Sequence, residues 1–279
     1  MIAAVFGLLS AALYGAADFL GGLAAKRSSI FAVVVISQGV GLVLLAAALP
    51  FFRPVFTARS AGFGFAAGCC GGVGVALLYR ALAVGKMGVV SPITAVLAAA
   101  MPVAIGVLAR GEHLSIRQSG GIAIALAAIV LVSLTPGPAG RLEFSGAGVR
   151  EAVAAGLALG GFLILLALAG ARAGIVALVC ARLGSTLLLF AYARAVGGVL
   201  KPQRTALPVI LCAGAVDVCA NALYLLAARY GYLAVAAVLT SLYPASTVVL
   251  ARYVLNERLA RIQKVGLGAA LAAAALIAS

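Results

Sequence analysis

Three ionisable residues lie inside long apolar runs of this sequence, where a charged side chain is costly. They are Asp18, Arg182 and Asp217. A charge at the centre of a membrane helix costs about 2.5–3.5 kcal/mol on insertion scales, so such residues commonly mark substrate pathways, proton relays or internal ion pairs. We expect Arg182 to pair with one of the two aspartates. The alternative is that these groups contact substrate or protons directly.

A polar stripe follows one face of the helix predicted at 205–228. Asp217, Asn221 and Tyr224 are spaced at i, i+4 and i+7, which places them on one side of an α-helix. Tyr14 and Asp18 share the i, i+4 spacing in the first predicted helix. Such a stripe should face the interior of a bundle rather than lipid. We therefore predict that these five side chains contribute to a substrate site.

Prolines interrupt two other predicted helices, at 88–109 and 232–254. Pro92 and Pro102 fall in the first and Pro244 in the second. A proline removes an intrahelical hydrogen bond and kinks the helix, so we predict gating hinges at these positions. Five polar residues beside the prolines either contact substrate or satisfy the kinked backbone: Ser91, Thr94, Thr240, Ser241 and Tyr243.

The chain lacks the residue clusters that enzymes use. His113 is the single histidine and lies in a polar connector, while the five cysteines lie in apolar runs without CxxC spacing. This pattern indicates neither a metal centre nor a nucleophile–base pair, and the sequence has no Walker motif for ATP. We expect no enzymatic activity, no catalytic residue, no metal and no cofactor.

The composition indicates a membrane protein. Hydrophobic residues make up 65% of the 279 residues and charged residues 9%, whereas a soluble domain carries about 25% charged residues. The net charge of +14 comes from cations spread singly between apolar runs. That distribution is typical of loops in membrane proteins and argues against nucleic-acid binding.

Apolar segments long enough to cross a bilayer, which takes about 20 residues each, occur ten times. They are 2–24, 30–52, 61–83, 88–109, 116–135, 147–170, 174–197, 205–228, 232–254 and 261–279. We therefore predict an all-α integral membrane protein with ten transmembrane helices. The third segment carries Gly64, Gly68 and Gly72, and small residues at this spacing predict close helix packing. The Lys and Arg residues of the connectors favour both termini outside the cytoplasm.

The connector that starts at Gly111 has a second copy in the other half of the chain. Four of its residues recur 145 positions later, and the pairs are Glu112 with Glu257, Leu114 with Leu259, Gln118 with Gln263, and Gly121 with Gly266. Tyr79 and Tyr224 are related in the same way. We predict two repeats, 1–140 and 141–279, of five helices each. Because five is odd, the second repeat must be inverted, an architecture of secondary transporters.

Two five-helix halves, each with a Gly/Asn-Glu-x-Leu-x3-Gln-x2-Gly connector before its last helix, resemble the EamA-type drug/metabolite transporter superfamily. Within it, the chain is similar to ten-helix bacterial exporters of amino acids and related metabolites, including aromatic amino acids. The resemblance implies a multi-pass protein of the bacterial inner membrane, with both termini inside. It also implies a cavity lined by helices 1, 3, 4, 6, 8 and 9, with helices 5 and 10 outside. The cavity would include Tyr79, Ser91, Asp217, Asn221, Tyr224 and Tyr243.

These observations predict a secondary transporter that exports amino acids, aromatic ones included, and related small metabolites by alternating access. Its partners are then a small-molecule substrate and the lipid bilayer, and the chain acts as a monomer or, alternatively, a homodimer. A sugar, nucleotide-sugar or cationic-drug carrier on the same scaffold is the alternative transporter. An intramembrane enzyme and a scaffold subunit are the alternatives from other classes. Proton coupling through Asp18 or Asp217 and facilitated exchange both fit the sequence.

Overall fold

The computed structural model describes residues 2–51, 55–84, 87–111, 113–133, 148–169, 174–254 and 261–278. Over these ranges the chain forms helices and contains no strand. The helices are α1 (Ile2–Ala25), α2 (Ile30–Ala48), α3 (Ala58–Val84), α4 (Met87–Arg110), α5 (Ile116–Ser133), α6 (Val149–Leu168), α7 (Gly174–Ala195), α8 (Leu207–Tyr230), α9 (Leu233–Thr240), α10 (Tyr243–Val254) and α11 (Arg261–Ala278), with a 3-10 turn over Leu49–Phe51.

Each apolar segment predicted from the sequence is helical over most of the part that the structure describes. Six helices there are long and apolar enough to cross a membrane, namely those of α1, α2, α3, α6, α7 and α8, and shorter apolar stretches cover Ile93–Ala109, Ile116–Leu131 and Leu233–Thr247. The predicted all-α membrane class is therefore confirmed. The number of crossings and the inverted repeat stay predictions.

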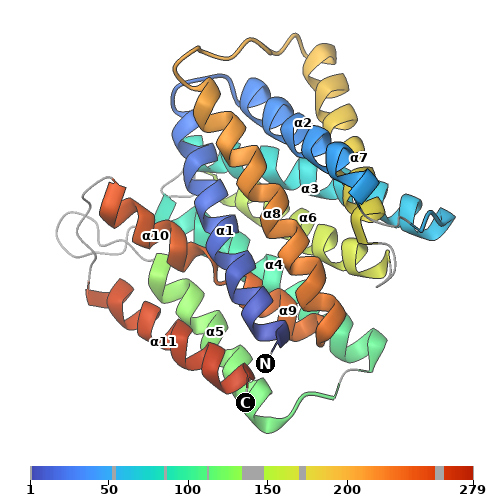
Figure 1. The fold of residues 1–279 in the computed structure, drawn as a ribbon. Helices are drawn as coiled ribbons and strands as arrows, with labels where there is room; N and C mark the ends of the chain where they lie inside the picture. The colour runs from blue at the N-terminus through green and yellow to red at the C-terminus, as the bar shows by residue number, and fades with distance from the viewer. Residues whose placement is uncertain are drawn as a thin grey trace.

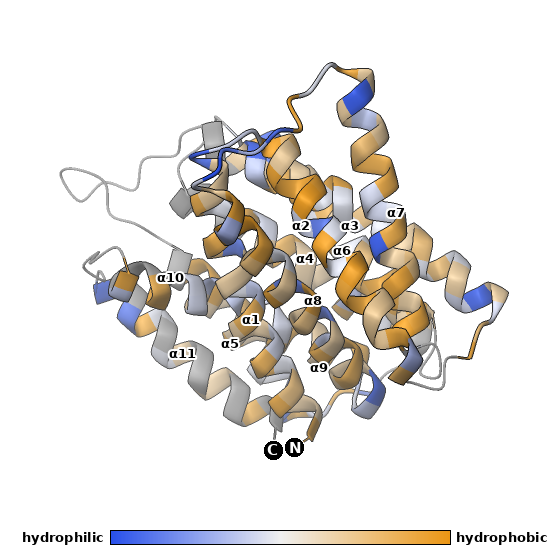
Figure 2. Ribbon diagram, turned by 45° about the horizontal axis from the view of Figure 1, so that its top comes forward, coloured by the Kyte–Doolittle hydropathy of each residue, from blue (hydrophilic) through white to orange (hydrophobic). Residues whose placement is uncertain are grey.

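The exterior of the bundle is apolar, as expected for contact with lipid. Large hydrophobic side chains such as Val43, Leu187 and Phe190 are exposed on helix surfaces. Hydrophilic residues gather mainly at helix ends and in connectors (Figure 2). This distribution places the apolar sides of the helices where acyl chains would surround them.

The helices pack around a centre formed mainly by α1, α3, α6 and α8. α1 lies along α8, α3 packs against both α6 and α7, α4 lies against α6, and α2 contacts α7 and α8 (Figure 1). α5 and α11 pack against each other at one side of the bundle (Figure 1).

Glycines of α3 allow unusually close contact with its neighbours. A Cβ added at Gly68 would lie 1.8 Å from the carbonyl oxygen of Ala181 in α7. Gly64 and Gly72, four residues to either side, also meet the α7 backbone or its side-chain stems, while Gly71 faces α6. The predicted close packing of this glycine-rich helix is confirmed.

The prolines have unequal effects on the backbone. α4 runs without a break past Pro92 and Pro102, whereas the predicted segment 232–254 is divided into α9 and α10 by Ser241 and Leu242, just before Pro244. A proline removes one hydrogen bond, and a long helix packed along its length can lose one bond and stay continuous. The predicted role of all three prolines as gating hinges stays a prediction.

Candidate functional site

A cavity opens among α1, α2, α3, α4, α6, α7, α8 and the junction of α9 with α10. It encloses about 790 Å³ of empty space, its opening to the surroundings included. Among the described residues, α5 and α11 contribute none to the lining, in line with the family resemblance. The resemblance did not imply α2 and α7, which also line the cavity.

An ion pair between Arg182 and Asp217 lies on the cavity wall. Arg182 Nη2 is 2.5 Å from Asp217 Oδ2, and Arg182 is only 5% exposed. Of the two candidate aspartates, Asp217 is therefore the partner. The guanidinium also donates through Nη1 to Gln38 Oε1, an oxygen that accepts a second hydrogen bond from Ser185 Oγ at 2.9 Å.

Gln38 and Ser185 were not identified as site residues from the sequence. Gln38 is an amide inside an otherwise apolar segment, and Ser185 follows Arg182 by three residues, so both carried a signal. The resulting network joins α2, α7 and α8: Asp217 neutralises the charge of Arg182, and Gln38 accepts a hydrogen bond from it. Arg182 is thus held by the protein itself.

Asp18 reaches the same cavity from α1 but is not neutralised. Its side chain lines the cavity, and its carboxylate makes no hydrogen bond or ion pair with any other residue that the structure describes. With Arg182 and Asp217 cancelling each other, the ionised cavity carries one unmatched negative charge. Such a charge is costly among apolar helices, and a cation or a proton would relieve the cost.

The amide of Asn221 is held in a fixed orientation beside the ion pair. Tyr14 donates from its hydroxyl to Asn221 Oδ1 at 2.6 Å, and Asn221 Nδ2 donates to the Asp217 carbonyl oxygen at 2.7 Å. Tyr14 and Asn221 both line the cavity. The structure therefore brings Tyr14, Asp18, Asp217 and Asn221 together, as the two i, i+4 pairs predicted.

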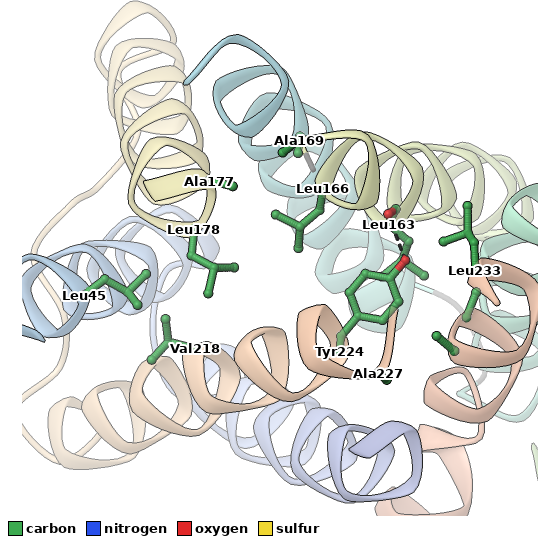
Figure 3. Packing of buried hydrophobic residues seen from close by; sticks show 13 residues of the cluster. Leu45, Leu163, Leu166, Ala169, Ala177, Leu178, Val218, Tyr224, Ala227 and Leu233 are labelled. Carbon is green, nitrogen blue, oxygen red and sulfur yellow. Dashed lines mark hydrogen bonds between the residues drawn. The ribbon is translucent and has the colours of Figure 1, made fainter. Parts of the chain in front are cut away.

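Tyr224 does not share this wall, which corrects the expectation from the polar stripe. Its side chain is fully buried among apolar residues, and its hydroxyl donates to the Leu163 carbonyl oxygen at 2.8 Å (Figure 3). Seven residues advance about 10.5 Å along a helix axis. From Asp217 to Tyr224, α8 therefore passes from the cavity into the packed contact with α6.

Tyr79, the counterpart of Tyr224 in the first half, also lies outside the cavity lining. It is 6% exposed within an apolar cluster, and a Cβ added at Gly21 would lie 1.8 Å from its hydroxyl oxygen. The phenol thus fills the space that Gly21 leaves on α1. The side chains of Ser91 and Pro92 lie outside the described residues.

Two hydroxyl groups at the junction of α9 and α10 face the cavity without partners. Thr240 Oγ1 and the Tyr243 hydroxyl are buried, and neither has a hydrogen-bond partner among the described residues. Ser241, between them, also lines the cavity. Thr94 behaves differently, because its hydroxyl donates to the Ala152 carbonyl oxygen at 3.1 Å. Of these polar residues, Thr94 therefore satisfies a backbone carbonyl group, whereas Thr240 and Tyr243 remain available to a substrate.

The opposite side of the cavity is apolar. α3 and α6 contribute most of it, with α4 and α7 adding Ala98 and Leu178, and its larger side chains are Val75, Leu78, Leu159, Phe162 and Leu163. The cavity therefore has one polar wall and one apolar wall. Chemically, it can hold a small amphipathic molecule whose charged groups gather at one end.

An all-helical membrane bundle with charged groups in a central cavity has the features of a transporter. Residues 147–279 match the model of the EamA-like transporter family. This match supports the drug/metabolite transporter superfamily and implies a membrane transporter of small molecules.

Solved structures share the fold of the whole chain. One crystal structure superposes with a TM-score of 0.75 over 98% of this chain and 95% of the other, at 16% sequence identity. At this identity the similarity concerns the fold alone. No curated protein matches the sequence.

Proposed function

We propose that the protein is a secondary transporter of the bacterial inner membrane that exports amino acids and related small metabolites, aromatic amino acids included. It works by alternating access between two inverted five-helix repeats. The observation that carries this proposal is the unpaired carboxylate of Asp18 beside the neutralised Arg182–Asp217 pair. An ammonium group is the common feature of amino acids, and this carboxylate would bind one.

The apolar wall supports amino acids over sugars. A sugar presents hydroxyl groups on all sides, and each would need a partner once buried. Val75, Leu159 and Phe162 offer none. An amino acid with an apolar side chain can place that side chain against α3 and α6 and its charged groups against α1 and α8.

Contacts between glycines and their neighbours support two related repeats. A Cβ at Gly15 would meet Tyr243 and Ser246, and a Cβ at Gly160 would meet Ala98 and Met101. All three pairs (Gly15 with Gly160, Ala98 with Tyr243, Met101 with Ser246) are separated by 145 residues. The contacts between helices follow the same relation. α1 packs against α8, and the corresponding pair α6 and α3 also pack together. Likewise α4 packs against α6, and the corresponding pair α10 and α1 pack together.

The direction of the packed helices supports inversion of one repeat. Gly231 lies against Ala3, and Tyr14 bonds Asn221, so α1 and α8 run in opposite directions. By the repeat relation α8 is the counterpart of α3. In a five-helix repeat α1 and α3 cross the membrane in the same direction, so α3 and its counterpart would be antiparallel.

Efflux from proteoliposomes tests the proposal. Vesicles containing the purified protein are loaded with a panel of radiolabelled amino acids, and release is followed with and without a pH gradient. We expect release of amino acids with apolar side chains, and at least a tenfold loss of rate in Asp18→Asn, because a charge-assisted contact to the ammonium group contributes about 1.5–3 kcal/mol. Wild-type vesicles that retain every amino acid would contradict the proposal.

The unmatched charge of Asp18 also suits an organic cation without a carboxylate, which makes a cationic-drug carrier the second candidate. The same vesicles distinguish the two. Under amino-acid export, excess unlabelled amino acid slows release of labelled amino acid more than an equal concentration of tetraphenylphosphonium does. The reverse order would favour the drug carrier.

A further inference from the structure

We propose that the junction of α9 and α10 binds the carboxylate of the substrate, through the hydroxyl groups of Thr240 and Tyr243 and the start of α10. This inference rests on the proposed function and specifies which end of the amino acid each wall receives. Asp18 binds the ammonium group, and Arg182 binds Asp217 and Gln38 of the protein rather than the ligand.

The two unpaired hydroxyl groups are the first observation. Thr240 is 2% exposed, and its Oγ1 and the Tyr243 hydroxyl lack a partner among the described residues while lining the cavity. Leaving a polar group buried and unpaired costs about 1–3 kcal/mol. A hydroxyl can donate one hydrogen bond, and an ionised carboxylate only accepts. Two unpaired donors on one wall of the cavity therefore match a carboxylate.

The start of α10 is the second observation. This 12-residue helix begins at Tyr243, which itself lines the cavity. The first turn of a helix carries a partial positive charge, which attracts anions. In this turn Pro244 has no N–H and the Ala245 N–H donates to the Leu242 carbonyl oxygen at 2.9 Å, which leaves the Tyr243 N–H for a ligand. Helices interrupted at membrane depth direct such ends at anionic substrate groups in other transporter folds. Here the interruption lies beside the two unpaired hydroxyl groups.

Other hydroxyl groups of the same turn are used for structure, which sets Thr240 and Tyr243 apart. Ser246 and Thr247 donate to the carbonyl oxygens of Ala11 and Gly15 in α1, each at 3.1 Å. These bonds, with the close contact of Gly15 to Tyr243, fix α10 against α1. Asp18 lies less than one turn beyond Gly15. The carboxylate of Asp18 and the start of α10 therefore border the cavity from adjoining elements, as the two charged groups on one substrate carbon require.

Arg182 is the obvious alternative receiver of a carboxylate, and its contacts argue against that role. Its two terminal nitrogens are engaged by Asp217 and Gln38. A substrate carboxylate that took the place of Asp217 on the guanidinium would leave this aspartate unpaired in the bundle. The junction needs no such displacement.

Matched probes and variants separate these possibilities. L-phenylalanine is compared with phenethylamine, which lacks the carboxylate, and with 3-phenylpropionate, which lacks the ammonium group. Binding to purified protein in detergent is measured by ligand-induced thermal shift, and transport is measured by counterflow in proteoliposomes. Thr240→Val and Tyr243→Phe each remove one hydroxyl. Thr94→Val and Tyr224→Phe serve as controls, because each removes a hydroxyl that donates to a backbone carbonyl oxygen and belongs to a residue outside the cavity lining.

We expect Thr240→Val and Tyr243→Phe each to weaken L-phenylalanine binding about tenfold, as loss of a hydrogen bond to a charged group does. Phenethylamine binding should stay within twofold of wild type in both. The controls should lower thermal stability without changing the ratio of the two affinities. Asp18→Asn should weaken phenylalanine and phenethylamine alike and leave 3-phenylpropionate unaffected.

Three results would overturn the inference. One is phenylalanine binding that is unchanged in both junction variants; a second is equal loss for phenylalanine and phenethylamine. The third is that the junction variants still bind phenylalanine more tightly than phenethylamine, whereas the Arg182→Gln, Asp217→Asn double variant does not. In each case phenylalanine transport by the wild type would leave the proposed function standing. A wild type that neither binds nor transports any amino acid of the panel would remove the proposed function and this inference together.

Discussion

At the scale of single residues, the polar groups of the cavity divide into those that the protein satisfies and those that it leaves open. Arg182, Asp217 and Asn221 have protein partners. Asp18, Thr240 and Tyr243 have none for their side-chain polar atoms among the described residues. Buried polar groups normally have hydrogen-bond partners. These three unpaired side chains therefore mark where a ligand would supply the missing contacts.

The ion pair predicts an asymmetric response to mutation. Arg182→Gln removes one partner and leaves Asp217 buried without its cation, and breaking such a pair costs about 3–5 kcal/mol. We expect a lower midpoint of thermal unfolding in detergent. Adding Asp217→Asn should restore part of the loss, because the unpaired charge is then gone. A double variant no more stable than Arg182→Gln would contradict this account of the pair.

Sequence spacing predicted part of this site and not the rest, for geometric reasons. The i, i+4 pairs placed Tyr14, Asp18, Asp217 and Asn221 correctly on the cavity side, because four residues stay within about one turn. Tyr224 lies on the same face of α8 but beyond the end of the cavity. Residue spacing predicts the face of a helix and does not predict how far along that face a cavity extends. Which aspartate meets Arg182 depends on the packing of α7 against α8, which one sequence does not contain.

At the scale of elements, the contact between α3 and α7 depends on the absence of side chains. The Gly68 position leaves no room for a methyl group against the Ala181 carbonyl oxygen. Gly62, on the same helix, has nothing within 4 Å of an added Cβ. The two positions therefore make a matched pair.

We expect Gly68→Ala to destabilise the protein by about 1–3 kcal/mol, as overpacking does, and Gly62→Ala to be neutral or slightly stabilising because Ala is the better helix former. Thermal unfolding in detergent and the yield of monodisperse protein measure both. Equal midpoints for the two variants would show that α3 and α7 are less tightly packed than the structure indicates.

The prolines illustrate how far local sequence determines an element. Pro244 correctly indicated a disturbed helix, and the observed break falls two to three residues before it, where Ser241 and Leu242 separate α9 from α10. Pro102 carries the same chemistry, yet α4 is continuous there. The presence of a proline therefore does not determine by itself whether a helix is interrupted. The open hydroxyl groups lie at the helix that did break.

At the scale of the whole molecule, positions of the cavity that are 145 residues apart carry unlike side chains. On the 145-residue relation, Tyr243 corresponds to Ala98, Asn221 to Ala76 and Asp217 to Gly72. At these three positions the second half supplies a phenol, an amide and a charge where the first supplies small residues, whereas Asp18 of the first half corresponds to Leu163 of the second. Under the proposed function, two related halves would rock against each other, and the asymmetric lining would give a small asymmetric molecule one preferred orientation.

The central claim, that the cavity is a pathway opening to each side in turn, is tested most directly by labelling one cavity position from both sides of a membrane. Val75→Cys, in a transport-competent background without the five native cysteines, is exposed to a membrane-impermeant maleimide added either outside or inside proteoliposomes. Leu187→Cys, on the apolar exterior, serves as the control.

Our account predicts that Val75→Cys reacts from both sides, that L-phenylalanine slows both reactions, and that Leu187→Cys reacts from neither. Reaction of Val75→Cys from one side only, or from neither side, would contradict it.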